Sequence, residues 1–112
     1  MNLLPAQLVD GVAIIGDARV ATPHLAGLGQ REVMLGIRPS EVTLGTEGVA
    51  GTVTLCELLG DDMIVDLDVG GLLVRVKAPG RGRIAEGERV HARFAVERLH
   101  VFDKASGARV SI

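Results

Sequence analysis

The sequence predicts an all-β fold, arranged as a small barrel or sandwich of many short strands. Three observations lead to this class. Apolar residues recur at every second position through most of the chain, which is the spacing of strands with one buried face. The 15 glycines are scattered at short intervals and mark tight turns. No segment has the apolar spacing of a helix longer than about a turn or two.

The length of the chain fits a single domain spanning residues 1–112. Hydrophobic residues make up 47% of the sequence but aromatic residues only 2%. The core is therefore expected to consist of Val, Leu, Ile and Ala. A chain of this size buries enough apolar surface to fold without a metal or a disulfide.

The first third of the chain is expected to contain an N-terminal strand and a hairpin. Residues 2–4 have strand character. Residues 12–15 and 18–21 are two apolar stretches separated by Gly-Asp, which predicts a hairpin with a two-residue turn. Residues 22–31 contain one proline and two glycines and are expected to form a surface connection.

A corner is predicted at Arg38-Pro39. Residues 32–38 have strand character, and Pro39 cannot donate a backbone hydrogen bond and pushes the residue before it towards an extended conformation. Pro39 also suits the first position of a short helical turn. We expect the strand to end at Arg38, the chain to turn, and a new strand to begin at Val42.

The middle of the chain has the clearest strand signals. Residues 52–57, 65–69 and 72–77 alternate polar and apolar side chains, with turns at residues 60–62 and at Gly70-Gly71. A two-residue turn at Gly70-Gly71 places Asp66 opposite Arg75 on neighbouring strands. We expect this pair to lie on a solvated face of the sheet.

The last third is expected to form further strands at residues 89–94, 99–103 and 108–112, with a helical turn at 95–98. The pleat of residues 99–103 places Leu99 and Val101 on one face, and His100 and Phe102 on the other. Eight residues with apolar spacing opposite charged neighbours are predicted to share one core: Val53, Leu55, Val65, Leu67, Val74, Val76, Val90 and Phe94.

Several functional classes lack support in the sequence. A phosphate-binding loop requires Gly-Lys followed by Ser or Thr, and the only lysines, Lys77 and Lys104, follow Val and Asp. The histidines are far apart along the chain, and none has zinc-ligand spacing with Cys56, which is expected to be a packing residue. No serine has a recognisable catalytic partner. We therefore expect no catalytic, metal or cofactor-binding residues.

Partners and compartment follow from charge and composition. The net charge of −2 and the absence of Trp and Tyr disfavour an oligonucleotide-binding barrel, which uses a basic groove and stacking aromatics. A small-oxyanion site built from Arg38 or Arg81 with the amides of a glycine-rich turn remains an alternative. A single cysteine fits a reducing compartment. The sequence shows neither a secretory signal nor an apolar run long enough to span a membrane, so we expect a cytoplasmic location.

Four stretches resemble one family. LGIRPSEV at 35–42, GTVTLCELLGDD at 51–62, GRGRIAEGERVHARF at 80–94 and ERLHVFDKASGARV at 97–110 are similar to the C-terminal domain of ATPase subunits of ABC-type carbohydrate importers. MNLLP at 1–5 resembles the point where the chain of that family leaves its nucleotide-binding domain. The resemblance covers essentially the whole sequence in the right order. One departure is Ser40, which stands where the family commonly has an acidic residue, with Glu41 following.

The resemblance implies a barrel related to the oligonucleotide/oligosaccharide-binding (OB) fold, called the TOBE domain, with additional strands. Its implied role is regulatory and dimer-supporting, without catalysis, in an importer of sugars or related solutes. ATP and Mg²⁺ then belong to the upstream nucleotide-binding domain. The implied partners are that domain, a second ATPase subunit, the membrane permease subunits indirectly, and in some members a regulatory protein, but not nucleic acid. The subunit would be peripheral on the inner face of the cell membrane.

The resemblance also implies contact residues. It places the Arg38-Pro39 corner towards the ATPase core or the partner subunit, and His100 and Phe102 near the dimer contact of the regulatory domains. The leading alternative is an oxyanion-binding domain, such as those for molybdate, which has a related barrel. An oligonucleotide-binding barrel is the weaker alternative.

Overall fold

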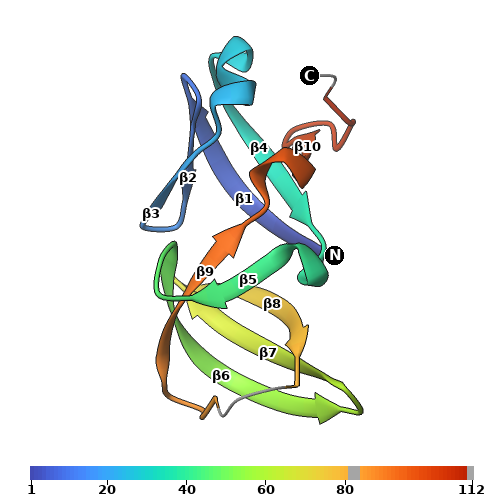
Figure 1. Cartoon of the computed structure of the whole chain (residues 1–112). Coiled ribbons are helices and arrows are strands. Elements are labelled where there is room, and N and C mark those ends of the chain that lie inside the picture. Colours follow the sequence, from blue (N-terminus) through green and yellow to red (C-terminus); the bar gives the residue numbers. More distant parts are fainter. Residues whose placement is uncertain (81–83, 111–112) are drawn as a thin grey trace.

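Two antiparallel sheets, each of five strands, make up the structure of residues 1–80 and 84–110, which are those that the computed structural model describes (Figure 1). The first sheet has the order β10-β4-β1-β2-β3, with the bounds β1 Asn2–Val9, β2 Val12–Ile15, β3 Ala18–Ala21, β4 Gln30–Ile37 and β10 His100–Asp103. The second has the order β5-β9-β6-β7-β8, with the bounds β5 Val42–Gly45, β6 Val49–Leu59, β7 Asp62–Val69, β8 Leu72–Pro79 and β9 Arg89–Phe94.

Helical structure in the described residues is limited to three short 3-10 turns, η1 Pro23–Leu28, η2 Pro39–Glu41 and η3 Val96–Arg98. The chain passes from the first sheet to the second through η2 and returns to it through η3, so the two sheets are interleaved along the sequence (Figure 1). The second sheet curls until its edge strands, β5 and β8, approach each other. The predicted all-β, barrel-like fold is confirmed. No helix in the described part of the chain is long and apolar enough to cross a membrane.

Both predicted two-residue hairpins are present. Ile15 pairs with Ala18 around the first turn, and Val69 pairs with Leu72 around the second. Gly70 and Gly71 have φ angles of 57° and 89°, which is the left-handed backbone that the favoured hairpin turns require at both central positions. The second turn fixes the predicted register of Asp66 opposite Arg75.

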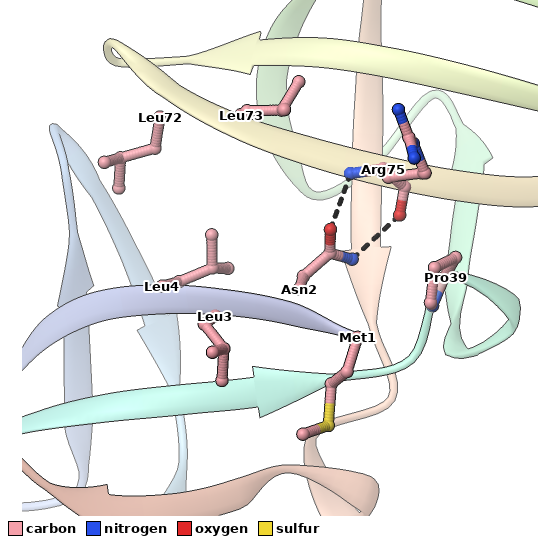
Figure 2. Close-up of a pocket in the computed structure, with 8 residues that line it drawn as sticks. All are labelled: Met1, Asn2, Leu3, Leu4, Pro39, Leu72, Leu73 and Arg75. Atoms are coloured by element: carbon pink, nitrogen blue, oxygen red, sulfur yellow. Dashed lines mark hydrogen bonds between the residues drawn. The ribbon is translucent and has the colours of Figure 1, made fainter. Parts of the chain in front are cut away.

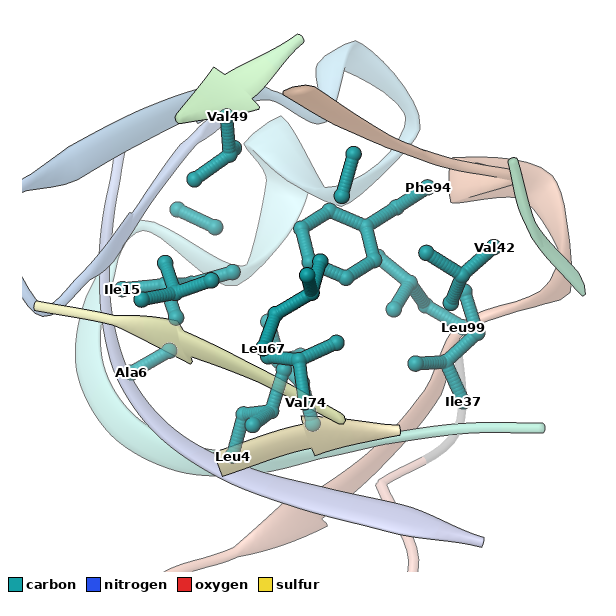
Figure 3. Packing of buried hydrophobic residues seen from close by; sticks show 14 of the residues in the cluster. Leu4, Ala6, Ile15, Ile37, Val42, Val49, Leu67, Val74, Phe94 and Leu99 are labelled. Carbon is teal, nitrogen blue, oxygen red and sulfur yellow. The ribbon is translucent and has the colours of Figure 1, made fainter. Parts of the chain in front are cut away.

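The core lies between the two sheets (Figure 3). Six of the eight predicted core residues are buried in it: Val53, Val65, Leu67, Val74, Val76 and Phe94. Val90 is half-buried and packs against the same cluster. Because the core is aliphatic, its strands are held mainly by the burial of branched side chains, at about 25 cal/mol per Å² removed from water.

Leu55 was predicted wrongly. The register between β6 and β7 shifts between Val53 and Leu55, so that Leu55 pairs with Asp66 instead of continuing the alternation. Leu55 is only half-buried and lies outside the core cluster, whereas Cys56 packs against that cluster. A bulge inserts one extra residue into a strand, and the faces of all later residues then exchange.

Three boundaries differ from those expected. The segment 22–31 is not a plain surface connection, because η1 buries Leu25 and β4 begins at Gln30. The strand expected to end at Arg38 ends at Ile37, and Arg38 has extended backbone angles at the start of η2. Of the strand expected at 108–112, residue 109 forms a single bridge with Phe102, and 111–112 lie outside the described residues.

The strand β1 runs further than expected and contains a proline. Pro5 pairs with Met34 of β4, while pairing with β2 begins only at Gln7. Pro5 therefore lies in the part of β1 that has a single neighbouring strand. A proline is tolerated there because the hydrogen bond that it cannot donate is not required by a second neighbour.

Candidate functional site

The Arg38-Pro39 corner joins the two sheets. Arg38 is exposed and Pro39 half-buried, and the amide of Glu41 donates to the carbonyl of Arg38 at 2.9 Å. The amide of Ala95 donates to the carbonyl of Glu41 at 3.0 Å, which ties this corner to the segment that leads back to the first sheet. One carboxylate oxygen of Glu41, Oε2, is buried without a hydrogen-bond partner among the described residues. Desolvation of such an oxygen without a donor is unfavourable, so Glu41 is a locally costly feature of this corner.

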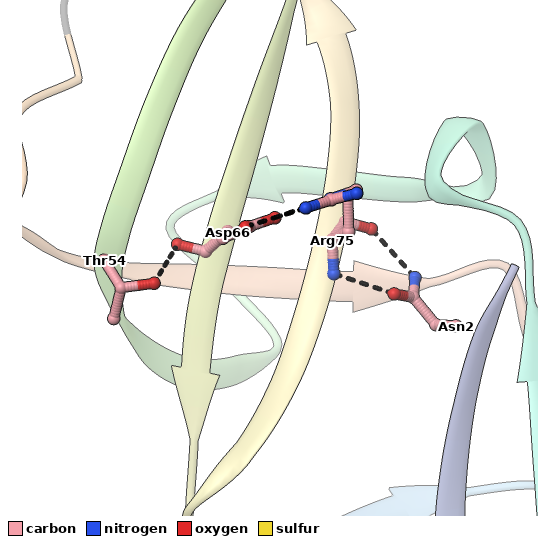
Figure 4. A network of polar contacts seen from close by, with 4 residues as sticks. All are labelled: Asn2, Thr54, Asp66 and Arg75. Carbon is pink, nitrogen blue, oxygen red and sulfur yellow. Dashed lines mark hydrogen bonds and ion pairs between the residues drawn. The ribbon is translucent and has the colours of Figure 1, made fainter.

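Asn2 connects the sheets a short distance from the corner. Its side-chain Nδ2 donates to the carbonyl of Arg75 at 2.8 Å, and the amide of Arg75 donates to Asn2 Oδ1 at 2.8 Å (Figure 4). The side-chain amide of Asn2 thereby pairs with the backbone of β8, an edge strand of the second sheet, as the backbone of a neighbouring strand would. Asn2 is 8% exposed, so both hydrogen bonds are largely protected from water.

The side chain of Arg75 makes a bidentate contact with Asp66. Arg75 Nε donates to Asp66 Oδ1 at 2.8 Å, and Arg75 Nη2 donates to Asp66 Oδ2 at 3.1 Å. The hydrogen bond to Asp66, followed by the attraction between the two charges, raises the pKa of Arg75 above its ordinary value. The predicted pairing is confirmed, but Asp66 does not lie on a solvated face, since its side chain is 8% exposed against 52% for Arg75.

A pocket of about 390 Å³ opens beside this network (Figure 2). Its walls come from the beginning of β1, from Pro39 and from β8. Three apolar side chains on its rim are strongly exposed: Met1 at 60%, Leu3 at 56% and Leu73 at 59%. Five large apolar side chains of the described chain are this exposed, and three of the five gather here. Such clustering is typical of a contact surface. Single exposed apolar residues, in contrast, are common on any protein surface and indicate no contact.

Phe102 and His100 occupy the outer face of the first sheet, as predicted from the pleat. Val101 between them is 1% exposed, and both residues are half-buried. His100 lies opposite Gly36, and Phe102 opposite Met34. His100 Nδ1 lies 2.7 Å from an Arg109 nitrogen.

Gly36 makes room for the apolar groups on this face. A Cβ atom at Gly36 would lie 3.2 Å from the Phe102 ring and 3.1 Å from the thioether of Met1. Met1 also lines the pocket that contains Pro39. Met1 therefore joins the predicted contact residues Pro39 and Phe102 into one surface, which we call the N-terminal apolar surface: Met1, Leu3, Pro39, Leu73 and Phe102.

Two of these five residues, Pro39 and Phe102, were predicted from the sequence, whereas Met1, Leu3 and Leu73 were not. Alternation already placed Leu3 and Leu73 on outward positions, since Leu4 and Val74 point inward. Arg38 is exposed at the corner but does not line the pocket, and Arg81 lies outside the described residues. Within the described residues, no group of three or more His, Cys, Asp or Glu side chains is placed to hold a metal ion.

Comparison with known proteins gives two matching family models. The TOBE domain model matches residues 35–102, and the model of the CysA C-terminal regulatory domain matches residues 2–44. The residues matched by the TOBE model include all strands of the second, OB-like sheet and the beginning of β10. Those matched by the CysA model include β1 to β4, which are most of the first sheet. The resemblance inferred from the four sequence motifs is thus confirmed.

Relatives in sequence are named as ATP-binding proteins. The chain is 33% identical over 127 residues to the trehalose/maltose import ATP-binding protein MalK of Thermococcus litoralis, covering 98% of the chain and 34% of MalK. It is 35% identical over 119 residues to the sn-glycerol-3-phosphate import ATP-binding protein UgpC of Burkholderia thailandensis, covering 97% of the chain and 33% of UgpC. It is 30% identical over 109 residues to a putative ATP-binding protein of Brucella suis, covering 96% of the chain and 31% of the relative.

The chain therefore spans about a third of the length of the relatives that it matches. Among solved structures, the cytoplasmic molybdate-binding protein ModG has the same fold, with a TM-score of 0.71 at 16% identity. The match covers 89% of this chain and 94% of the ModG chain.

Proposed function

Since the chain belongs to the TOBE domain family, we propose that it is the regulatory part of an ABC-type ATP-binding subunit that serves an importer of sugars or related solutes. It does not hydrolyse ATP itself; ATP and Mg²⁺ bind to another domain of the subunit. The subunit lies on the cytoplasmic side of the membrane, where it meets the permease. Support comes from the match to a regulatory-domain model and from relatives named as sugar and glycerol-phosphate import proteins.

The observation that carries the regulatory role is the N-terminal apolar surface. Three of its side chains are more than half exposed although the chain has an ample core in which to bury such groups. We propose that the part around Phe102 and His100 contacts a second copy of the subunit. The Arg38-Pro39 corner then faces the ATP-binding domain, with the exposed side chain of Arg38 available for contact.

The substitution Phe102→Ser tests the contact between copies. Full burial of a Phe side chain contributes about 1.5–3 kcal/mol, and Phe102 is already half-buried in the fold. The part left to bury in a contact is therefore worth about fourfold to tenfold in association, which is too little for a tight dimer. The chain is expected to self-associate weakly, near millimolar concentration, in sedimentation velocity. Phe102→Ser should shift this association to about fourfold to tenfold higher concentration and lower the melting temperature only slightly, since half of the side chain is already packed in the fold.

The matched control is Leu58→Ser. Leu58 is 70% exposed on the β6–β7 hairpin, outside the N-terminal apolar surface, and its replacement should leave sedimentation unchanged. If Phe102→Ser lowers the melting temperature strongly with no change in sedimentation, Phe102 stabilises the fold and the contact is elsewhere. An equal effect of both substitutions would point to nonspecific association through exposed apolar side chains.

An oxyanion-binding role is the second candidate, because the fold is shared with molybdate-binding ModG. Thermal unfolding in the presence of molybdate, tungstate, sulfate and phosphate separates the two proposals. A ligand that binds the folded chain raises its melting temperature as the ligand concentration rises. A melting temperature that rises with the concentration of one oxyanion would favour the oxyanion-binding role. Unchanged melting temperatures with all four oxyanions would favour the regulatory role.

A further inference from the structure

One edge of the first sheet is formed by β3, whose single strand neighbour among the described residues is β2. The amide of Thr22 donates to the carbonyl of Gly11 at 2.7 Å, directly after the pair of Val12 and Ala21. Hydrogen-bonded and non-hydrogen-bonded pairs alternate along an antiparallel ladder. The backbone N–H and C=O groups of Arg19 and Ala21 therefore point away from β2, towards the free edge.

This free edge borders a cleft towards the second sheet. Two adjoining pockets of about 310 Å³ and 350 Å³ share Arg19, Gly48 and Val49 as lining residues. Their lining residues include all four residues of β3, together with residues at the beginning of β6 and on β9. At about 3.3 Å per residue, the four residues of β3 match an extended peptide of four or five residues.

The cleft is positively charged. Arg19, Arg89 and Arg93 line it, and no ion pair joins any of the three to a carboxylate among the described residues. All three arginines are exposed. Among the described residues that line the cleft, Asp17 at the turn before β3 is the single acidic one. This local charge contrasts with the net charge of −2 for the whole chain.

We propose that this cleft binds an acidic peptide segment in extended conformation, which adds a strand to the edge of β3. The backbone groups of Arg19 and Ala21 pair with the peptide backbone, as in other complexes formed by strand addition. The three guanidinium groups bind carboxylates on alternate residues of the peptide, because arginine matches the geometry of a carboxylate and its charge strengthens the hydrogen bonds. The site is separate from the N-terminal apolar surface and does not depend on the contact proposed there.

A single-stranded nucleic acid fits this cleft less well than a peptide. Binding of bases requires exposed aromatic side chains on which to stack. The only aromatic residue of the cleft is Phe94, which is 6% exposed and belongs to the core. The exposed edge of β3, by contrast, offers the alternating donors and acceptors that a peptide backbone needs.

The test uses the whole chain and a capped, fluorescein-labelled hexapeptide of alternating Glu and Val. Fluorescence anisotropy at low salt should show saturable binding that weakens as salt screens the charges. The double substitution Arg19→Gln and Arg93→Gln should weaken binding at least about tenfold, since it removes two charged hydrogen-bond donors. Arg98→Gln is the matched control, because Arg98 is exposed but lines neither pocket, and it should change binding less than about twofold.

Two further peptides test strand addition itself. A peptide of the same sequence with alternate N-methylated residues keeps its charge but loses backbone donors, and it should bind at least about tenfold more weakly. Amide hydrogen exchange of Arg19 and Ala21, followed by NMR, should slow when the unmodified peptide binds. A peptide of alternating Lys and Val should not bind.

The proposal is overturned if the acidic peptide does not bind saturably or if Arg98→Gln weakens binding as much as the double substitution. It is also overturned if the N-methylated peptide binds equally well, because binding then rests on charge alone. Displacement of the peptide by equimolar phosphate or molybdate would identify a small-anion site instead. Circular dichroism of each variant establishes that it is folded.

Discussion

The link between the two sheets through Asn2 is open to a direct test by Asn2→Ala. The substitution removes both hydrogen bonds to the backbone of Arg75, each 2.8 Å long, and leaves an amide and a carbonyl of the edge strand unpaired. A typical hydrogen bond contributes about 0.5–1.5 kcal/mol to stability. The loss is therefore expected to be about 2 kcal/mol, or roughly 8 °C in melting temperature for a domain of this size.

The assay has to avoid intrinsic fluorescence, because the chain has no Trp or Tyr. Urea unfolding followed by far-ultraviolet circular dichroism measures the free energy of unfolding, and calorimetry gives the melting temperature. Asn2→Asp keeps the acceptor for the Arg75 amide but loses the donor, and it should be destabilising because a carboxylate oxygen then faces the Arg75 carbonyl.

Gln7→Ala is the matched control. Gln7 is an exposed amide side chain on the same strand, so its loss should change stability by less than about 0.5 kcal/mol. If Asn2→Ala also costs less than about 0.5 kcal/mol, the two sheets are held together by the core alone and the reasoning about Asn2 is refuted.

Three other predictions concern the core, a turn and the pH dependence. Leu67→Ala, at a side chain with no exposed surface, should cost about 2–5 kcal/mol in urea unfolding, and a loss below about 1 kcal/mol would contradict its burial. Gly48→Ala places a Cβ 2.2 Å from a carbonyl oxygen of β9 at a φ of 118° and should cost at least about 2 kcal/mol, whereas Gly45→Ala, with open space around its Cβ, should cost about 1 kcal/mol or less. The amide of Ser106 lowers the pKa of Asp103 in the folded chain, so Asp103 stabilises the fold above its unfolded pKa and loses this effect as the pH falls through the folded pKa. The urea midpoint of the native chain should exceed that of Asp103→Asn at about pH 7, and this difference should shrink as the pH is lowered to about 3. An unchanged difference would show that Asp103 is not coupled to folding.

Local rules decided much of the strand pattern. The turn residues at positions 16–17 and 70–71 favour two-residue hairpins, so the register of Asp66 opposite Arg75 follows from counting outward from the turn. The alternation of residues 99–103 likewise placed Phe102 and His100 on the outer face, because the period of a strand is a property of its backbone. Such features depend on neighbours in sequence.

Features that depend on neighbours in space were not visible in the same way. The bulge after Val53 lies where β6 passes from pairing with β9 to pairing with β7, and Leu55 after it is turned away from the core. The burial of Leu25 follows from where η1 packs, since alternation does not extend into a helical turn. Residue spacing does not specify which strand a given strand will meet.

By itself, the sequence determined the all-β class, most strand positions, two hairpin registers and the family, because these follow from short-range periodicity and from motifs. The tertiary structure alone decided which distant residues share a surface. It brought Asn2 to Arg75 across 73 positions of the chain, gathered Met1, Leu3 and Leu73 with Pro39 around one pocket, and placed Met1 and Phe102 over Gly36. It also placed Arg19 of the first sheet next to Arg89 and Arg93 of the second. The physical reason is that these groupings depend on how the two sheets pack, and that packing minimises the exposed apolar area of the whole chain rather than of any one segment.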